Sequence, residues 1–451
     1  MNRRSRVAVI HLLALSVVTA AVTADADALN DGERRSVAVS AFTDSFVPRG
    51  MRLDLIHSGT ADSERYSLDQ VREEPFWGGR YGRLTDFPDY GKYRVSVYAM
   101  PLGRLIYRYG YSSLFGEWQT TAEAASGRVR AIEEAVRFPM PRRQVRVVIA
   151  SRKKDGRFED VYSVTIDPGS REVDRGRRFD GVEVLNLEVN GPPESVVDVL
   201  ILGDGYTEGE SAKFNKDARR FLRVLFQTSP FKEMRQSFAV RAIRAPSAGS
   251  GPDEPRRGIF TDTGLSTTFD TFGSARYLTS TRSRDLRDLA ALAPYDTLIV
   301  MVNTSRYGGG GIFGLYSVFA SDNEFDEYIM THEFGHGFAG LGDEYYSSSV
   351  AYSDFYPRGV EPWEPNLTAL LKDHPLKWRA LVDDSTPIPT PPDRARYGNV
   401  VGAFEGAGYS AKGLYRPAMD CKMFSKGNKG FCPVCKAAVE DMIRLLTSPG
   451  G

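Results

Sequence analysis

The hydrophobic pattern of the chain changes between residues 168 and 195, a polar stretch that contains glycine and proline. Before this stretch, residues 94–100, 104–112 and 144–166 alternate apolar and polar side chains, which is the period of a half-buried strand. The segment 144–166 carries two such runs around a Lys-Asp-Gly turn, as a hairpin does. We therefore predict a β-sandwich for residues 29–180, with a structural or substrate-presenting role.

A different pattern follows, in which strand-like apolar runs alternate with helical segments. The segments predicted as strand, helix, helix and strand are 196–206, 207–226, 283–293 and 296–303. Thr207 and Glu210 are spaced as a capping box, which would start the first of these helices. Alternation of strands and helices predicts an α/β layer, so we expect a second domain with a mixed sheet over residues 181–451. The glycine run within 306–321 is predicted to be a flexible turn before a last, edge strand.

The N-terminus has the three-part organisation of a secretory signal peptide. Arginines precede an apolar run from Val7 to about Val22, and small residues up to Ala28 provide A-x-A cleavage sites. The alternative is a membrane anchor, but the run is short against the roughly 20 apolar residues that span a bilayer, and it contains His11. We therefore expect residues 1–28 to be removed and the mature chain to be exported, secreted or periplasmic, without a stable membrane anchor.

The charge composition gives no reason to expect a nucleic-acid partner. Lys+Arg and Asp+Glu both number 58 among 451 residues, so the net charge favours no class of partner. A basic patch with interleaved aromatic residues, the usual footprint of nucleic-acid binding, does not stand out in the sequence.

The segment THEFGHGFAGLGDEYY, residues 331–346, contains the pattern H-E-x-x-H. On a helix, His332 and His336 lie one turn apart on one face, so both imidazoles can reach one Zn2+ ion. Glu333 can then take the proton of a zinc-bound water as that water attacks a carbonyl, which is the mechanism of zinc proteases. The chain has only five histidines, so a chance pair of surface histidines is the weaker interpretation.

The H-E-x-x-H pattern does not identify the third zinc ligand. Gly342, ten residues after His332, cannot ligate, whereas the carboxylate of Asp343 is an acceptable zinc ligand. The glycine-rich turn after the helix allows the chain to fold back, with Leu341 packing inward. We predict Asp343 as the third ligand and a structural partner for Glu344, with Glu344 as the alternative ligand. The remote alternatives are Glu361, Glu364 and His374.

Further segments in the second half of the chain carry a resemblance to a known family. In chain order they read VDVLILGDGYTEGESAKF, PF, then HEFGHGFAGLGDEYY, and later PNLTALL, PLKW, FEGAGY, YRPAMDCKM and FCPVC. Over roughly residues 195–440 the sequence resembles the IgA-peptidase-type secreted zinc metallopeptidases, a metzincin-like group. The resemblance implies a metzincin-like zincin domain with an active-site helix. It does not carry a substrate over, and cleavage of immunoglobulin is not assumed.

The resemblance also implies roles for individual residues. His332 and His336 would be zinc ligands and Glu333 the catalytic residue of an endopeptidase that acts on proteins or peptides. A methionine-bearing turn would lie beneath the metal, best matched by Met423, with Met419 as the alternative. Read alone, either methionine would be assigned to core packing.

Two tyrosines are further candidates for the site. Tyr409 and Tyr415 could donate a hydrogen bond to the transition state, although packing in an aromatic cluster is the more frequent role of such residues.

The three cysteines lie close together near the C-terminus, at Cys421, Cys432 and Cys435. Export permits disulfides, so we predict one intrachain bridge from Cys421 to Cys432 or Cys435, with Cys432–Cys435 as the alternative pairing. Zinc binding is the weaker interpretation, because a closed site needs four ligands and no histidine is near in the sequence.

Three functions compete for these features. The leading hypothesis is a secreted zinc-dependent endopeptidase. The second is a surface- or carbohydrate-binding protein with a vestigial zinc site, which the presence of Glu333 argues against. The third is a serine hydrolase, but the sequence GYSAKG at 408–413 lacks the second glycine of a nucleophile elbow.

Overall fold

The protein is described from a computed structural model that covers residues 41–346, 355–427 and 430–449. The predicted signal peptide, residues 1–28, lies outside these ranges. Within the described residues, no helix has both the length and the apolar character of a membrane span.

Two four-stranded sheets make up the N-terminal region, with the orders β5-β1-β2-β8 and β4-β3-β6-β7. Their strands are β1 (Phe46–Gly59), β2 (Glu64–Glu74), β3 (Tyr93–Ala99), β4 (Arg104–Tyr111), β5 (Arg130–Pro141), β6 (Val145–Arg152), β7 (Phe158–Ile166) and β8 (Val173–Asp174). All neighbours are antiparallel except β2 and β8. Both sheets contribute to one apolar core, which includes Leu53, Val95, Phe138 and Val147. The predicted β-rich N-terminal region is therefore confirmed, and β3, β4, β6 and β7 lie where the alternating pattern predicts strands.

The sequence pattern does not predict β1, because charged side chains occupy buried positions of this strand. Arg52, Asp54 and His57 are all buried. His57 lies between two acidic residues, with Nδ1 2.8 Å from Glu134 and Nε2 3.3 Å from Glu64. Buried charges of this kind remove the apolar–polar alternation by which a strand is recognised.

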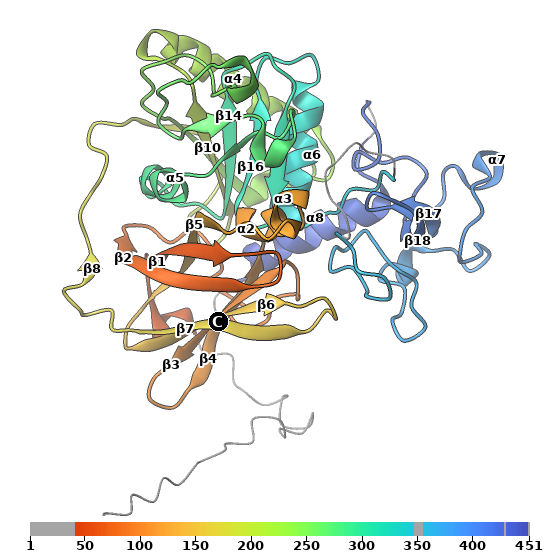
Figure 1. Cartoon of the computed structure of the whole chain (residues 1–451), viewed down its shortest axis with the longest axis horizontal. Helices are drawn as coiled ribbons and strands as arrows, with labels where there is room; N and C mark the ends of the chain where they lie inside the picture. The colour runs from red at the N-terminus through yellow and green to blue at the C-terminus, as the bar shows by residue number, and fades with distance from the viewer. Residues whose placement is uncertain (1–40, 347–354, 428–429, 450–451) are drawn as a thin grey trace, which may run out of the picture. The chain divides into compact units, whose positions relative to one another are not determined.

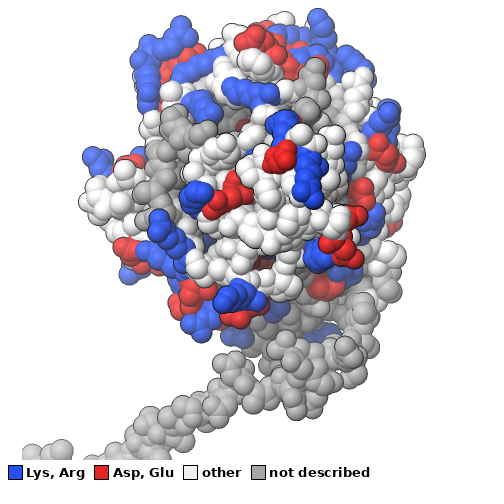
Figure 2. Space-filling view, turned by 90° about the vertical axis from the view of Figure 1, so that its right-hand side faces the viewer, with Lys and Arg blue, Asp and Glu red and all other residues white. Residues whose placement is uncertain are grey.

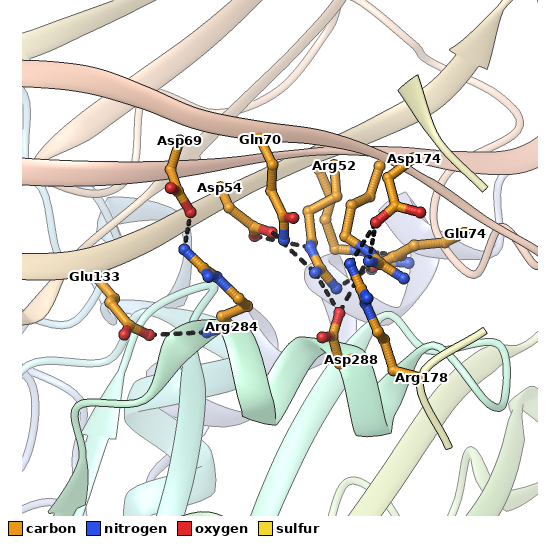
Figure 3. Close-up of polar contacts among 12 residues, drawn as sticks. Arg52, Asp54, Asp69, Gln70, Glu74, Glu133, Asp174, Arg178, Arg284 and Asp288 are labelled. Atoms are coloured by element: carbon orange, nitrogen blue, oxygen red, sulfur yellow. Dashed lines mark hydrogen bonds and ion pairs between the residues drawn. The ribbon is translucent and has the colours of Figure 1, made fainter. Parts of the chain in front are cut away.

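Buried ion pairs join β1 to helix α5 (Ser283–Ala290) of the second region (Figure 3). The guanidinium of Arg52 lies 2.8 Å from Asp54, 3.2 Å from Glu74 and 2.5 Å from Asp288. Burial lowers the pKa of Arg52, but the three carboxylates outweigh it and raise the pKa above its ordinary value. A second polar group on the same helix comprises Arg284, Asp69 and Glu133.

A six-stranded mixed sheet forms the centre of the second region, in the order β15-β16-β14-β10-β11-β9. The strands are β9 (Val184–Val189), β10 (Val197–Asp204), β11 (Phe238–Arg244), β14 (Thr297–Val302), β15 (Gly309–Ile312) and β16 (Tyr316–Ala320). The four central strands are parallel, and β9 and β15 pair antiparallel at the two edges. This arrangement agrees with the predicted mixed sheet.

The glycine run at 308–311 is not the flexible turn that the sequence predicts. Most of it forms the edge strand β15, which pairs with β16 and packs against helix α6 (Asp326–Ala339). A Cβ atom on Gly311 would lie 2.4 Å from the carbonyl oxygen of Glu333. The glycines are therefore explained by the close approach of β15 to α6.

Three longer helices accompany this sheet, α4 (Ser211–Gln227), α6 and α8 (Pro433–Leu446). The capping box of Thr207 and Glu210 is present, but it caps a 3-10 turn, Glu208–Glu210, that directly precedes the first of them. Helix α6 packs along β16, β15 and β14, and it also contacts α4 and α8 (Figure 1). Residues from the C-terminal part of the sequence, among them Cys421, Met423 and Phe431, share one apolar core with α6.

The remaining elements are short. They are α1 (Phe42–Ser45), α2 (Leu114–Trp118), α3 (Ala122–Ala125), α7 (Arg394–Tyr397), β12 (Thr267–Thr268), β13 (Thr279–Ser280), β17 (Phe404–Ala407), β18 (Ser410–Arg416), and the 3-10 helices η2 (Glu208–Glu210), η3 (Arg235–Ser237), η4 (Pro255–Arg257), η5 (Thr271–Gly273) and η6 (Arg379–Leu381). On the face drawn in Figure 2, basic and acidic side chains are interspersed, in line with the equal numbers of both signs in the sequence.

Candidate metal centre

Helix α6 carries both histidines of the H-E-x-x-H pattern, one turn apart. His332 is 6% exposed, and His336 lies on the same face with its Nε2 atom 3.1 Å from the Nε2 atom of His332. This is the arrangement that the spacing of the two residues predicts on a helix.

The helix ends in a tight glycine turn that reverses the chain. Gly340 adopts a left-handed conformation with φ of 65°, and its N–H donates to the carbonyl of His336. This 5→1 bond is the αL type of helix end, and the N–H of Leu341 additionally donates to the carbonyl of Gly335. Leu341 is 2% exposed, so it packs inward as the sequence predicts. The turn brings the next residues back beneath the histidines.

Asp343 meets the two histidines at the end of this turn. Its Oδ1 atom lies 3.2 Å from Nε2 of His332 and 3.2 Å from Nε2 of His336. Four ligands held tetrahedrally at about 2.1 Å from a zinc ion are about 3.4 Å apart. The three atoms of His332, His336 and Asp343 therefore have a spacing that fits one zinc-sized ion.

Hydrogen bonds on the far side of each imidazole define which nitrogen faces the other ligands. Nδ1 of His332 lies 3.1 Å from the carbonyl oxygen of Lys422, and Nδ1 of His336 lies 2.5 Å from that of Leu341. A carbonyl oxygen only accepts, so the proton of each neutral ring belongs on Nδ1. Both Nε2 lone pairs then point at Oδ1 of Asp343, which is buried and has no hydrogen-bond partner within the described ranges. Three lone pairs that converge in this way are the ligand atoms that a bound cation requires.

The charges at the site also favour a cation. Burial disfavours the protonated form of His336, but the Asp343 carboxylate outweighs burial and raises the pKa of His336 to about 9. Burial acts to raise the pKa of Asp343, yet the two imidazoles hold it well below its ordinary value. Burial raises the pKa of Glu333 above its ordinary value, because desolvation disfavours the charged carboxylate.

A cavity of about 980 Å³ opens over these residues. Glu333 lies on its wall beside the edge strand β15, and a Cβ atom on Gly309 would lie 2.9 Å from Oε1 of Glu333. The glycines of β15 thus leave the carboxylate uncovered and expose strand backbone to the cavity.

Comparison with known families agrees with this geometry. The profile described as IgA Peptidase M64 matches residues 185–396 and 392–443, and the profile described as Peptidase M64 N-terminus matches residues 41–163. The chain belongs to the M64 peptidase family. Membership identifies it as a metallopeptidase, which acts on proteins or peptides and uses a metal cofactor. No curated protein matches the chain.

The N-terminal region contributes to the cavity of this M64 peptidase, which the sequence did not reveal. Its contribution includes Lys92, Glu117 and Lys153. Glu117 lies on α2, accepts a hydrogen bond from the hydroxyl of Tyr277, and has its pKa raised to about 7 by burial. The fold places α2 at the cavity. No motif around Glu117 in the sequence indicates this position. The region therefore has a position suited to presenting substrate.

The other candidate ligands lie apart from this donor set. Among the described residues, the group of potential ligand atoms within 4.8 Å of one another contains Asp343 with the two histidines and no later residue. Glu364 accepts a hydrogen bond from Tyr356 at 3.0 Å, and Glu361 pairs with Lys377 at 3.1 Å. His374 is exposed and is not among the described residues that line the cavity.

Glu344 points away from the histidines, as expected for a residue with a structural partner. Its Oε1 atom accepts from the side-chain amide of Asn366 at 3.0 Å and from Sγ of Cys435 at 3.1 Å. Asn366 also bonds both backbone groups of Gly342, at 2.7 and 2.9 Å, and so clamps the turn that carries Asp343. The sequence showed Asn366 only as part of the PNLTALL segment, without a role.

Met423 lies beneath the active-site helix and Met419 does not. Met423 is fully buried, and its Sδ atom would lie 3.1 Å from a Cβ atom on Gly335, the residue just before His336. Met419 belongs to a small separate cluster with Tyr397 and Phe404.

The two tyrosine candidates have different positions. The hydroxyl of Tyr409 donates to Oδ2 of Asp343, and Tyr409 lines the cavity. Tyr415 pairs through its backbone with Thr368 and is not among the described cavity residues. Tyr328, to which no sequence motif gives a role, lies with its hydroxyl 3.3 Å from Nδ1 of His332.

The predicted disulfide is absent from the structure. Cys421, Cys432 and Cys435 are buried free thiols. The Sγ atoms of Cys421 and Cys435 are 3.7 Å apart, a distance that excludes a covalent bond between them.

Proposed function

We propose that this M64 peptidase is an exported zinc endopeptidase that uses His332, His336 and Asp343 as metal ligands and Glu333 as its catalytic base. The observation that carries the proposal is the convergence of two Nε2 lone pairs and one unpaired carboxylate oxygen, 3.1–3.2 Å apart, at the wall of a cavity beside Glu333. Nitrogen and oxygen ligands from three residues, with one position left open to the cavity, are typical of a catalytic rather than a structural zinc site.

Each residue of the proposed site has a distinct task. Zinc held there would supply a Lewis acid that lowers the pKa of water and polarises the scissile carbonyl. Glu333 accepts a proton from the attacking water at its carboxylate and delivers it to the leaving amine, which its raised pKa favours. Tyr409 holds the Asp343 carboxylate in orientation through Oδ2, so that Oδ1 remains directed at the histidines.

The substrate is proposed to lie in an extended conformation along β15. This edge strand carries no side chains at its first three positions, Gly309–Gly311, and its residues line the cavity. The backbone of Gly309 already bonds Arg276 and Leu278, so a peptide could pair with this edge only beyond Gly309, as extended chains do with edge strands. Because these three glycines have no side chains, the preference for particular substrate side chains would be set by residues on the opposite wall of the cavity.

We further propose the domain limits and the cellular destination that the sequence suggests. Residues 1–28 would be a cleaved signal peptide, residues 29–180 a substrate-presenting β-domain, and residues 181–451 a metzincin-like catalytic domain with Met423 beneath the metal. The family matches at 41–163 and 185–443 support the division. Sequencing of the N-terminus of protein recovered from outside the cytoplasm tests the export, since an uncleaved chain would contradict it.

Replacing Asp343 should remove metal and activity together. We expect Asp343→Ala to weaken zinc binding at the active site by more than the roughly 10- to 100-fold that follows loss of a residue that merely orients a ligand. Competition with a chromogenic chelator measures the affinity. Asp373→Ala, an exposed carboxylate, is the matched control and should bind zinc like the wild type. Unchanged affinity in Asp343→Ala would exclude Asp343 as a ligand.

Cleavage of an unfolded protein tests the proposed function against the alternative of a surface- or carbohydrate-binding protein. The mature chain should cleave the substrate at internal peptide bonds, a chelator should stop the reaction, and added Zn2+ should restore it. Glycan or surface binding without cleavage, under conditions in which zinc is bound, would favour the alternative.

A further inference from the structure

We propose a second, structural zinc site formed by Cys421, Cys432, Cys435 and Glu344, on the far side of the turn that carries the active-site carboxylate. One ligand atom from each of the four residues lies within 4.8 Å of the others. All four residues are buried, three of them at 0% exposure. They form a compact group inside the apolar core that surrounds α6 and α8.

The spacing of the ligand atoms suits a metal ion better than a disulfide. Thiolates held tetrahedrally at about 2.3 Å from zinc are about 3.8 Å apart, whereas a disulfide brings the sulfurs to about 2.05 Å. The Sγ atoms of Cys421 and Cys435 are 3.7 Å apart, and Sγ of Cys435 lies 3.1 Å from Oε1 of Glu344. The ligand atoms lie within 4.8 Å of one another, and separations of about 3.8 Å would place all four around one ion.

The carboxylate of Glu344 gives an independent reason to expect a cation. Glu344 is 0% exposed, and its Oε2 atom has no hydrogen-bond partner in the part of the chain that the structure describes. Burying a carboxylate with one oxygen unpaired is unfavourable, and a cation would compensate it. A disulfide between any two of the cysteines would leave the third thiol outside the bridge and Oε2 of Glu344 without a partner, whereas a zinc ion would use all four groups.

The local backbone prepares the group to act as thiolates. Cys432 is the N-cap of α8 with Pro433 directly after it, and Cys435 lies in the first turn of that helix, where the helix dipole favours negative charge. The N–H of Cys432 donates to Sγ of Cys421 at 3.3 Å. Soft thiolate ligands select zinc over the hard cations Ca2+ and Mg2+. Each thiol gives its proton to solvent when zinc binds.

The proposed site would stabilise the two chain segments that position the active-site residues. The N–H of Glu344 donates to the carbonyl of Met423 at 2.9 Å, and the carbonyl of Lys422 faces Nδ1 of His332 at 3.1 Å. In the sequence, Cys421 directly precedes Lys422 and Met423, and Glu344 directly follows Asp343. A closed four-ligand site leaves no position for substrate, so its role would be structural. Its ion would fix the turn beneath the histidines and the turn that carries Asp343 relative to each other.

The zinc content of a variant without the active-site histidines tests the proposal. The wild-type mature chain should contain two zinc ions, and the double variant His332→Ala/His336→Ala should retain one, with its fold checked by near-ultraviolet circular dichroism. X-ray absorption at the zinc edge should show sulfur at about 2.3 Å in the double variant. After denaturation, three free thiols should be titrated for each retained zinc. Absence of zinc from the folded double variant would overturn the proposal.

A second measurement does not depend on the folding of that variant. Non-reducing peptide mapping of the wild-type chain should find no disulfide among the three cysteines, and denatured wild type should release two zinc ions. A mapped bridge, or wild-type zinc whose X-ray absorption shows no sulfur ligand, would also overturn the proposal. In the complementary variant Cys435→Ser, the active site should keep its ligands but bind zinc about 10- to 100-fold more weakly, the effect expected when the support of a ligand is lost.

Discussion

Glu333→Gln should lower kcat/KM for peptide hydrolysis by about 100- to 10,000-fold, the contribution of a positioned general base. The amide keeps the size of the side chain and its place beside β15, but it cannot accept the proton of the attacking water. Glu333 contributes no atom to the group of His332, His336 and Asp343, so the metal content should not change. Initial rates on an unfolded protein substrate, measured together with zinc content, check both expectations.

The matched control is Glu327→Gln on the same helix. Glu327 is exposed and precedes His332 by more than one turn, so its replacement removes the same charge from α6 without touching the cavity. Its activity should equal that of the wild type. If Glu333→Gln also stayed within a few-fold of the wild type, the catalytic base would have to be another residue of the cavity, and Glu117 would be the first to examine.

Arg52→Met should reduce the free energy of unfolding by about 3–5 kcal/mol, the usual effect of removing one partner from a buried ion pair. Arg52 is fully buried and contacts three carboxylates, one of which, Asp288, belongs to helix α5 of the second region (Figure 3). Methionine fills a similar volume but leaves these carboxylates without their shared cation. Denaturant unfolding, followed by tryptophan fluorescence, measures the change.

Arg49→Met provides the comparison for a surface charge. Arg49 lies on the same strand and pairs with Glu73 at 2.6 Å, but its side chain is 59% exposed. Solvent screens such a pair, so its loss should change the stability by about 0–1 kcal/mol. Equal effects of the two substitutions would mean that the buried network does not hold the N-terminal region against α5.

The active-site helix and its turn were predictable because their determinants are local. Spacing along one helix brings His332 and His336 together, and glycine at position 340 supplies the left-handed residue that ends the helix and turns the chain toward Asp343. Strands β10 and β14 of the second region followed from apolar runs for the same reason. Each of these inferences uses residues that are neighbours in the sequence.

The features that the sequence did not reveal depend on contacts between distant segments. Strand β1 escapes recognition because Arg52 is buried by partners on β2 and α5, and a charge in a strand otherwise indicates exposure. Asn366 clamps the turn at Gly342 from a loop that has no motif. Glu117 reaches the cavity from a short helix in the N-terminal region. The predicted disulfide is wrong, and the spacing of the cysteines along the chain does not reveal that the carboxylate of Glu344 lies among the three thiols.

An anomalous difference map at the zinc edge, from crystals of the mature chain purified without added metal, tests the proposed active site most directly. We expect a peak within the cavity, about 2.0–2.2 Å from Nε2 of His332, Nε2 of His336 and a carboxylate oxygen of Asp343. A map with no peak between these three residues, or with a peak that lies beyond about 4 Å from the Asp343 carboxylate, would contradict it.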